Sequence, residues 1–122
     1  MKNIFDILKR DDQGLVAAII QHAETGQVLM LGYMNDESLS ITLEKQKACF
    51  WSRSRQELWL KGETSGNMLH VKEIRVDCDA DALILQCEPV GPTCHTNETS
   101  CFFRTVDADG GLMLAGDGVA KE

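Results

Sequence analysis

The sequence predicts a strand-dominated α+β domain with one main helix. Short apolar runs bounded by Gly, Asn, Asp and Ser recur along most of the chain, which is typical of strands joined by turns. Helical spacing of apolar residues is clear only at Leu39 and Leu43, behind Asn35, which is a favourable helix cap. A length of 122 residues suits a single domain, whose core we expect at about 14–106.

The first half of the domain is expected to contain four strands and the helix. A polar lead-in over 1–13 is expected to be loosely held. The aliphatic run Leu15–His22 predicts a buried strand, and Gln27–Tyr33 returns from it after the turn Ala23–Gly26. The helix is expected at 36–47, followed by strands at Ala48–Ser54 and Leu58–Lys61. Two glycines among small polar residues predict a loop at Gly62–Asn67.

The second half is expected to consist of three strands and two polar connections. Met68–Asp77 and Ala82–Pro89 predict two strands with an acidic segment between them. Gly91–Ser100 is expected to be a loop, and Cys101–Val106 a last short strand. The remaining tail, 107–122, is rich in Gly and Asp, and we expect it to be frayed.

Charge and cysteine content restrict the class of protein. The net charge of −7 argues against nucleic-acid binding through a broad basic surface. The N-terminus lacks the apolar core of a signal peptide, and no apolar run approaches the ~18 residues of a membrane span. We therefore expect a cytoplasmic protein without membrane contact. In that compartment, five cysteines favour free thiols or metal thiolates over disulfides.

Three carboxylates alternate along five residues at Asp77, Asp79 and Asp81. If this segment is extended, the three carboxylates share one face and repel one another, unless a cation or solvent offsets the repulsion. Oxygen ligands of this kind suit magnesium, calcium or manganese. An EF-hand loop is excluded because Ala82 stands where that loop requires glycine. A solvated turn without a cation is the alternative to a divalent-cation site.

Three cysteines in the same half of the chain could bind zinc. Cys78 lies among the acids, on the opposite face of an extended segment, and Cys94 and Cys101 follow. Three thiolates without a fourth protein ligand leave the open position that a catalytic zinc needs. The alternative is that these are ordinary buried thiols. Cys49 and Cys87 sit within apolar strands, and we assign both to the core.

The role of His95 depends on its neighbour Cys94, a candidate zinc ligand. His95 could be a fourth ligand, a general base or a loop residue that makes only a backbone hydrogen bond. The other two histidines, His22 and His70, have no acidic or cysteine neighbours in the sequence, and we interpret both as structural or surface residues.

Aromatic and basic residues gather in 51–61 and precede the polar loop 62–67. Strand alternation predicts that Trp51, Arg53 and Arg55 share one face, where a ring and guanidinium groups suit a base and a phosphate. The loop adds backbone N–H and hydroxyl donors. An amphipathic strand with a hairpin loop is the alternative. The candidate substrate-binding residues are Trp51, Ser52, Arg53, Arg55, Trp59, Lys61, Thr64, Ser65, Gly66 and Asn67.

Several runs in the same order resemble the phosphoribosyl-AMP cyclohydrolase family of histidine biosynthesis. The matching runs cover roughly 14–103 and include Val28–Asn35, Ser52–Arg55, Leu58–Asn67, Asp77–Leu83, Gly91–Thr96 and Ser100–Phe102. The chain departs from the family at Asn97, where Gly is common, and at His22, where many relatives have an acid. Asn tolerates a left-handed backbone better than most residues, so the loop can keep its shape.

The resemblance implies a hydrolase that opens the adenine ring of 1-(5-phosphoribosyl)-AMP between N1 and C6. It implies one zinc per subunit on Cys78, Cys94 and Cys101, and magnesium at Asp77, Asp79 and Asp81. It also implies a homodimer with zinc ligands from both subunits, and we expect the fold to be an intertwined dimer of antiparallel, barrel-like sheets. His95 is our candidate for the general base. A non-catalytic zinc-binding or nucleotide-binding module is the alternative function.

Overall fold

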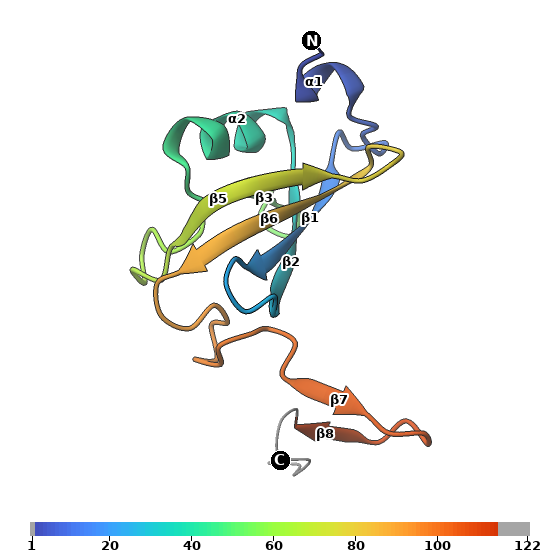
Figure 1. Cartoon of the computed structure of the whole chain (residues 1–122), viewed down its shortest axis with the longest axis vertical. Helices are drawn as coiled ribbons and strands as arrows, with labels where there is room; N and C mark the ends of the chain where they lie inside the picture. The colour runs from blue at the N-terminus through green and yellow to red at the C-terminus, as the bar shows by residue number, and fades with distance from the viewer. Residues whose placement is uncertain (1, 115–122) are drawn as a thin grey trace.

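The computed structural model describes residues 2–114 and shows the strand-dominated α+β fold that the sequence predicts (Figure 1). The elements of the first half are α1 (Ile4–Ile7), β1 (Val16–His22), β2 (Val28–Met34), α2 (Asp36–Lys45), β3 (Cys49–Ser52) and β4 (Glu57–Leu60). Those of the second half are β5 (Leu69–Val76), β6 (Ala82–Pro89), β7 (Arg104–Val106) and β8 (Leu112–Leu114). None of the helices described is long and apolar enough to cross a membrane.

The strands form one open sheet and two hairpins, so the expected barrel-like arrangement is not observed. The main sheet has the order β2-β1-β6-β5, and the hairpins are β3–β4 and β7–β8. The expectation of purely antiparallel pairing is also wrong, because β1 and β6 are parallel. A long connection separates β2 from β6 along the chain. It returns the chain to the edge of β1, so that β6 runs beside β1 in the same direction.

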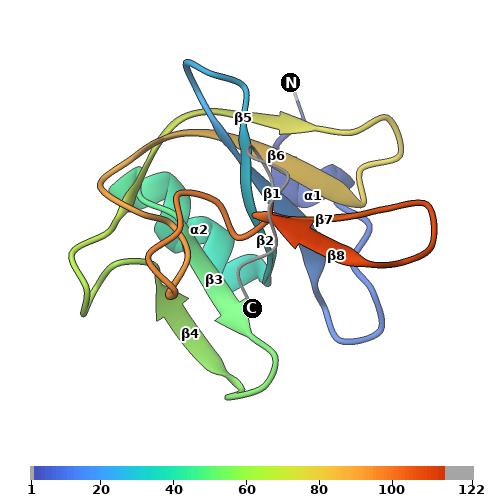
Figure 2. The same cartoon turned by 90° about the horizontal axis from the view of Figure 1, so that it is seen from below.

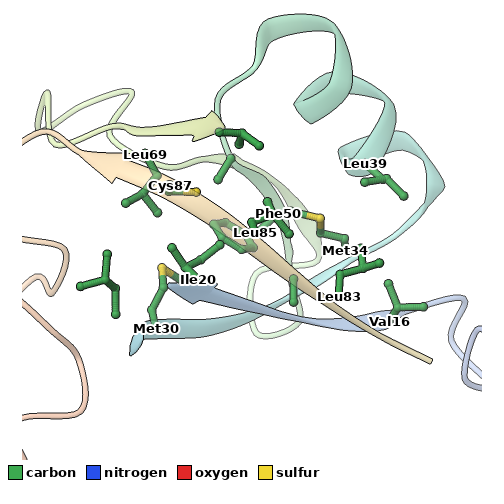
Figure 3. Packing of buried hydrophobic residues seen from close by; sticks show 14 of the residues in the cluster. Val16, Ile20, Met30, Met34, Leu39, Phe50, Leu69, Leu83, Leu85 and Cys87 are labelled. Carbon is green, nitrogen blue, oxygen red and sulfur yellow. The ribbon is translucent and has the colours of Figure 1, made fainter. Parts of the chain in front are cut away.

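The core fills the space between the main sheet, α2 and β3 (Figure 3). Strand β1 places Val16, Ala18 and Ile20 in it by alternation. Phe50 of β3 is fully buried and presses against Gly32 of β2, where an added Cβ would lie 2.6 Å from the ring. This contact holds the β3–β4 hairpin against the main sheet and thereby positions the residues that follow β3.

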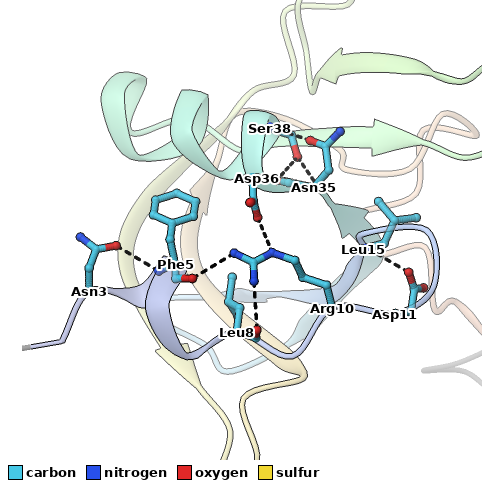
Figure 4. A network of polar contacts seen from close by, with 9 residues as sticks. All are labelled: Asn3, Phe5, Leu8, Arg10, Asp11, Leu15, Asn35, Asp36 and Ser38. Atoms are coloured by element: carbon cyan, nitrogen blue, oxygen red, sulfur yellow. Dashed lines mark hydrogen bonds and ion pairs between the residues drawn. The ribbon is translucent and has the colours of Figure 1, made fainter.

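The lead-in is ordered, so the prediction that it is loosely held is wrong. Asn3 caps α1 through a capping box, and Leu8 is buried in the core. The guanidinium of Arg10 then ties three segments together (Figure 4). It donates to Asp36 at 2.6 Å, to the carbonyl of Leu8 at 3.1 Å and to that of Phe5 at 3.0 Å.

The C-terminal hairpin β7–β8 extends away from the main sheet (Figure 1). The prediction that the chain is frayed from 107 onward is wrong where the second strand of the hairpin, β8, forms. The part of that tail from 115 lies outside the described residues. Val106 and Leu112 are a cross-strand pair and are 65% and 56% exposed. Phe102, which precedes the hairpin, is exposed as well.

Candidate active site and metal centres

A pocket of about 660 Å³ lies between the β3–β4 hairpin, the loop 62–67 and the loop that follows β6. Figure 2 shows this last loop, which connects β6 to β7, beside β3 and β4. The pocket brings together the expected residues Arg55, Trp59, Lys61, Thr64, Ser65, Asn67, Cys94 and His95. Gly66 belongs to the same loop but does not border the pocket. Residues that sequence reasoning missed include Glu57, Glu63 and Asn97.

A second pocket, of about 640 Å³, contains the other expected residues Trp51, Ser52 and Arg53. The expectation that Arg53 and Arg55 share one face of a strand is wrong, because β3 ends at Ser52 and Arg53–Gln56 is a turn. The Arg53 guanidinium lies 3.8 Å from the ring centroid of Tyr33, a residue that the sequence did not single out as a site residue. Trp59 borders both pockets.

The loop 62–67 is held in shape by its own glycines and by contact with the loop after β6. Gly62 has φ of 88°, and a Cβ there would lie 2.5 Å from the backbone of Asn67 and Met68. The Gly66 N–H donates to the Gly62 carbonyl at 2.8 Å. Asn67 in turn reaches Gly91, where a Cβ would lie 2.7 Å from Oδ1 of Asn67. The two loops that line the pocket therefore pack directly on each other.

The loop after β6 places Cys94 in the pocket wall. The Asn97 N–H donates to the Cys94 carbonyl at 2.9 Å. Asn97 has φ of 72°, the left-handed conformation expected of this residue. The Thr96 hydroxyl donates to Sγ of Cys94 at 3.1 Å. Burial raises the pKa of the Cys94 thiol, but the hydrogen bonds from Thr96, and then the nearby Cys101 and Lys61, lower it further than burial raises it.

The second thiol of this loop, Cys101, is anchored to the main sheet. Its N–H donates to the carbonyl of Leu29 in β2 at 2.7 Å, and the Ser100 hydroxyl donates to the carbonyl of Val28 at 2.7 Å. The residue is exposed, yet desolvation of its thiol and the neighbouring Cys94 raise the pKa of Cys101 to about 11. Each of these two thiols affects the pKa of the other, which places them in the same neighbourhood.

Cys78 is separated from this pair by the full length of β6. It lies in the turn before Ala82, whereas Cys94 follows Pro89 at the other end of the strand. Within residues 2–114, no cysteine is part of a group of three close His, Cys, Asp or Glu ligands. One chain therefore brings together two of the three expected thiols, and the third lies elsewhere on its surface.

The three aspartates do come together. Oxygen atoms of Asp77, Asp79 and Asp81 all lie within 4.8 Å of one another. The segment is not extended, because 78–81 is a turn in which Ala80 has φ of 62°, so the carboxylates converge by a different geometry from that of a strand face. Oδ1 of Asp77 accepts hydrogen bonds from the N–H groups of Asp81 at 3.0 Å and Ala82 at 3.3 Å.

These contacts move the pKa values of two aspartates in opposite directions. For Asp77, desolvation raises the pKa, but hydrogen bonds with Asp81, Ala82 and Asp79 together outweigh it and the pKa is lowered. Hydrogen bonding to Asp77 and then to Asp79 raises the pKa of Asp81. The cluster thus retains negative charge on Asp77 and exposes oxygens that a hard divalent cation can bind.

The remaining cysteines and histidines have the structural roles that the sequence predicts. Cys49 and Cys87 are buried, and burial raises the pKa of Cys87 to about 12. His22 accepts the N–H of Glu24 on Nδ1 at 3.1 Å and so closes the turn after β1. His70 lies in β5 and pairs with Lys47 in an isolated bridge.

Comparison with known proteins identifies the family. The family model for phosphoribosyl-AMP cyclohydrolase matches residues 30–103. A phosphoribosyl-AMP cyclohydrolase of Chlorobium phaeovibrioides is 54% identical over 93% of this chain and 82% of its own length. Those of Chloroherpeton thalassium and Rhizorhabdus wittichii are 57% and 56% identical over 87% and 85% of this chain, and 76% and 84% of their own lengths. The chain belongs to the phosphoribosyl-AMP cyclohydrolase family.

Proposed function

We propose that this protein hydrolyses 1-(5-phosphoribosyl)-AMP, opening its adenine ring between N1 and C6 to give the formimino-aminoimidazole carboxamide ribotide of histidine biosynthesis. The observation that carries the proposal is the pocket in which the donor-rich loop 62–67 faces Cys94 and His95. Such a pocket offers groups for a nucleotide's phosphate and ribose beside a thiol and an imidazole. The family membership supplies the reaction, and the five free cysteines accord with a cytoplasmic enzyme.

The thiols fit a zinc ion that two subunits share. Cys94 and Cys101 interact, and the contacts of Cys94 favour its thiolate, which is the form that binds zinc. Cys78 cannot join them in the same chain, because the eight residues of β6 span roughly 26 Å. Cys78 of the partner subunit would therefore complete the ligand set, giving one zinc per subunit in a homodimer.

The hairpin β7–β8 supports this homodimer. A two-stranded hairpin is marginally stable in water unless it packs against something. Here the pair Val106 and Leu112 is exposed, although apolar residues of this kind gain free energy from burial. The hairpin begins three residues after Cys101. A partner that brings its Cys78 to that cysteine would lie beside the hairpin and could cover its apolar pair.

The aspartate cluster fits magnesium. Its three exposed carboxylates converge within 4.8 Å and supply the oxygen ligands that hard divalent cations prefer. Cys78 is part of the same turn. The aspartates would therefore approach the pocket together with the partner's thiol, and a magnesium ion held by them would supply positive charge for the phosphates of the substrate.

The chain's own residues would bind the nucleotide and move the proton. Bound to three thiolates, zinc would supply a Lewis acid that promotes attack by water at neutral pH. His95 borders the pocket beside Cys94, so its imidazole would accept the proton of the attacking water and return it to N1 as the ring opens. Trp59 would stack on the base, while Arg55 and the hydroxyls of Thr64 and Ser65 would hold a phosphate.

A spectroscopic ring-opening assay tests the proposal. The purified protein is assayed with phosphoribosyl-AMP before and after chelation, and zinc and magnesium are then returned separately and together. We expect turnover that chelation abolishes and that only both metals together restore fully. Binding of zinc or of the nucleotide without any ring opening would instead indicate a non-catalytic zinc-binding or nucleotide-binding module.

A further inference from the structure

The second pocket, of about 640 Å³, is nearly as large as the first and has no role in the chemistry described so far. The turn that joins β3 to β4 contributes Arg53 and Ser54 to its lining, and the last residue of β3, Ser52, adds a hydroxyl. A guanidinium beside two hydroxyls is a donor set that suits a phosphate.

Hydrogen bonds fix the shape of this turn. The Gln56 N–H donates to the Ser52 carbonyl at 2.8 Å, and the side-chain amide of Gln56 donates to the Arg53 carbonyl at 2.7 Å. The Ser52 hydroxyl accepts the Arg55 N–H at 3.3 Å. The backbone that carries both arginines is therefore set by the turn itself.

The side chain of Arg53 is held by an aromatic ring. Its guanidinium carbon lies 3.8 Å from the ring centroid of Tyr33, a partly buried residue of β2. Gly32 allows the Phe50 ring of β3 to approach β2, which brings the end of β3 close to Tyr33. A guanidinium that stacks on a ring uses its face, and the N–H groups along its edge stay available for an anion.

No ion pair among the residues that the structure describes includes Arg53. The side chain is exposed to solvent and borders the second pocket. Arg53 therefore combines a fixed position with a positive charge that no carboxylate of the described chain neutralises. Such a preorganised cation binds an anionic group at a low cost in side-chain entropy.

Trp59 separates the two pockets and borders both of them. Its ring packs on Phe50, with centroids 5.5 Å apart, and 40% of the residue is exposed. Arg55 borders the first pocket and Arg53 the second, so one guanidinium is available on each side of Trp59. This arrangement fits a ligand with an aromatic centre and an anionic group at each end.

We propose that the second pocket binds the phosphate of the AMP half of the substrate, with Arg53 as its ligand and Tyr33 as the positioning residue of Arg53. The proposal rests on the proposed function. Phosphoribosyl-AMP carries one ribose phosphate on N1 and another on N9 of the purine. The reacting N1–C6 bond belongs in the first pocket beside Cys94 and His95, so the ribose phosphate on N1 meets Arg55. N9 is at the far end of the purine, and its ribose phosphate extends past Trp59 into the second pocket.

The experiment uses AMP as a probe, because AMP has the ribose phosphate on N9 and lacks the one on N1. Arg53→Met and Arg55→Met form the matched pair, since each removes one guanidinium and keeps an unbranched stem. Lys72→Met, at an exposed position of β5, is the control for loss of a positive charge elsewhere. On the full-length protein loaded with zinc and magnesium, isothermal titration calorimetry measures AMP affinity. A ring-opening assay on the same protein gives kcat and KM for phosphoribosyl-AMP.

We expect Arg53→Met to weaken AMP binding by about 10-fold to 100-fold, as loss of a charge-assisted hydrogen-bond donor does. It should raise KM for phosphoribosyl-AMP more than it lowers kcat, because the phosphate it holds is remote from the reacting bond. Arg55→Met should raise KM but leave AMP affinity unchanged. Lys72→Met should match the unmodified protein in both measurements.

Two substitutions test the positioning role of Tyr33. Tyr33→Phe keeps the ring and should retain AMP affinity, whereas Tyr33→Leu removes the ring and should lose part of it. Once Arg53 is replaced, Tyr33→Leu should cause no further loss, because residues that act through each other are not additive. Thermal unfolding checks that each variant folds, and Tyr33→Met replaces Tyr33→Leu if the latter does not. Additive losses in the double variant would overturn the positioning role.

Loss of AMP affinity in Arg55→Met but not in Arg53→Met would overturn the proposal, because the AMP half would then lie in the first pocket. Unchanged AMP affinity and unchanged KM in Arg53→Met would overturn it as well. The unmodified protein separates these failures from failure of the proposed function. If it does not open the ring of phosphoribosyl-AMP, the proposed function fails, and the role of the second pocket fails with it. If it opens the ring and Arg53→Met has the same KM and AMP affinity, only the role of the second pocket fails.

Discussion

Cys78 and Cys94 lie beyond opposite ends of strand β6, so the strand that separates them in sequence also holds them apart in space (Figure 1). Cys94 and Cys101 belong to the same loop after β6, whereas Cys78 lies in the β5–β6 turn that also carries the three aspartates. A zinc ion that needs all three thiols must therefore recruit Cys78 from another copy of the chain.

Mixing two inactive variants tests this sharing. If zinc is shared within a homodimer as proposed, every zinc site of the Cys78→Ser and Cys101→Ser proteins lacks a thiol, and both proteins should be inactive. After unfolding and refolding together, half of the dimers are mixed, and each of those has one intact site of two. We expect recovery of about a quarter of the unmodified activity at equal total protein. Cys78→Ser mixed with Cys78→Ser remains inactive as the control, and no recovery in the first mixture contradicts a shared site.

The Thr96 hydroxyl should set the reactivity of Cys94. Its hydrogen bond to Sγ favours the thiolate and contributes to the lowered pKa of Cys94, so Thr96→Val should raise that pKa. In zinc-free protein, alkylation of Cys94 at neutral pH should slow, and the midpoint of its pH profile should move to higher pH. Mass spectrometry of the modified peptide distinguishes Cys94 from Cys101. Thr99→Val, at an exposed position of the same loop, is the control.

Replacement of His95 should reduce turnover without loss of metal. His95 borders the pocket beside Cys94, and a general base contributes about 10²-fold to 10⁴-fold to a rate. His95→Ala should therefore lower kcat by that factor and leave KM and zinc content nearly unchanged. His70→Ala, in β5 and outside the pocket, should keep its kcat. Zinc-depleted His95→Ala would show instead that His95 is a ligand.

Elements with a strong local pattern could be predicted from the sequence. The strand β1, predicted from its aliphatic run, the capped helix α2 and the two long strands β5 and β6 lie within a few residues of their expected ranges. The loop 62–67 was predicted from its glycines, and Asn97 has the left-handed backbone that its residue type allows. Turn and cap chemistry acts over a few residues, and it can therefore be recognised without the rest of the fold.

Features that depend on distant contacts could not be predicted. The parallel pairing of β1 and β6, and the open sheet that results, follow from how a long connection packs. Leu8 and Arg10 hold the lead-in only because the core and Asp36 lie beside it. Likewise, strand alternation predicted that Arg53 and Arg55 lie on one face. In the structure a turn follows Ser52, and the two arginines border different pockets. Periodicity could not reveal where that strand ends.

Gly62 and Gly66 form a matched pair for testing the pocket loop. Both have positive φ, 88° and 83°, but a Cβ at Gly62 meets the backbone of Asn67 and Met68, whereas one at Gly66 meets nothing within 4 Å. Gly66→Ala should cost only the left-handed conformation, about 1–2 kcal/mol in free energy of unfolding. Gly62→Ala should cost about 3 kcal/mol or more, since the clash adds to that strain. Urea denaturation at one protein concentration measures both, and equal costs would contradict the packing.

If the hairpin β7–β8 packs against a second subunit, as proposed, a charge on its apolar face should weaken that contact. Val106 and Leu112 are opposite each other and exposed, whereas Thr105, the neighbour of Val106 in β7, points to the other face by strand alternation. A charge at the centre of an apolar contact is costly, so Val106→Asp should weaken the dimer at least about tenfold. Sedimentation velocity over a range of concentrations measures this change, and Thr105→Asp is the control for a charge on the same strand.

Since zinc would be shared between subunits, Val106→Asp should also lower activity at low protein concentration, and the activity should return at high concentration. If the Val106→Asp and Thr105→Asp proteins dimerise with equal affinity, the subunit interface lies away from this hairpin.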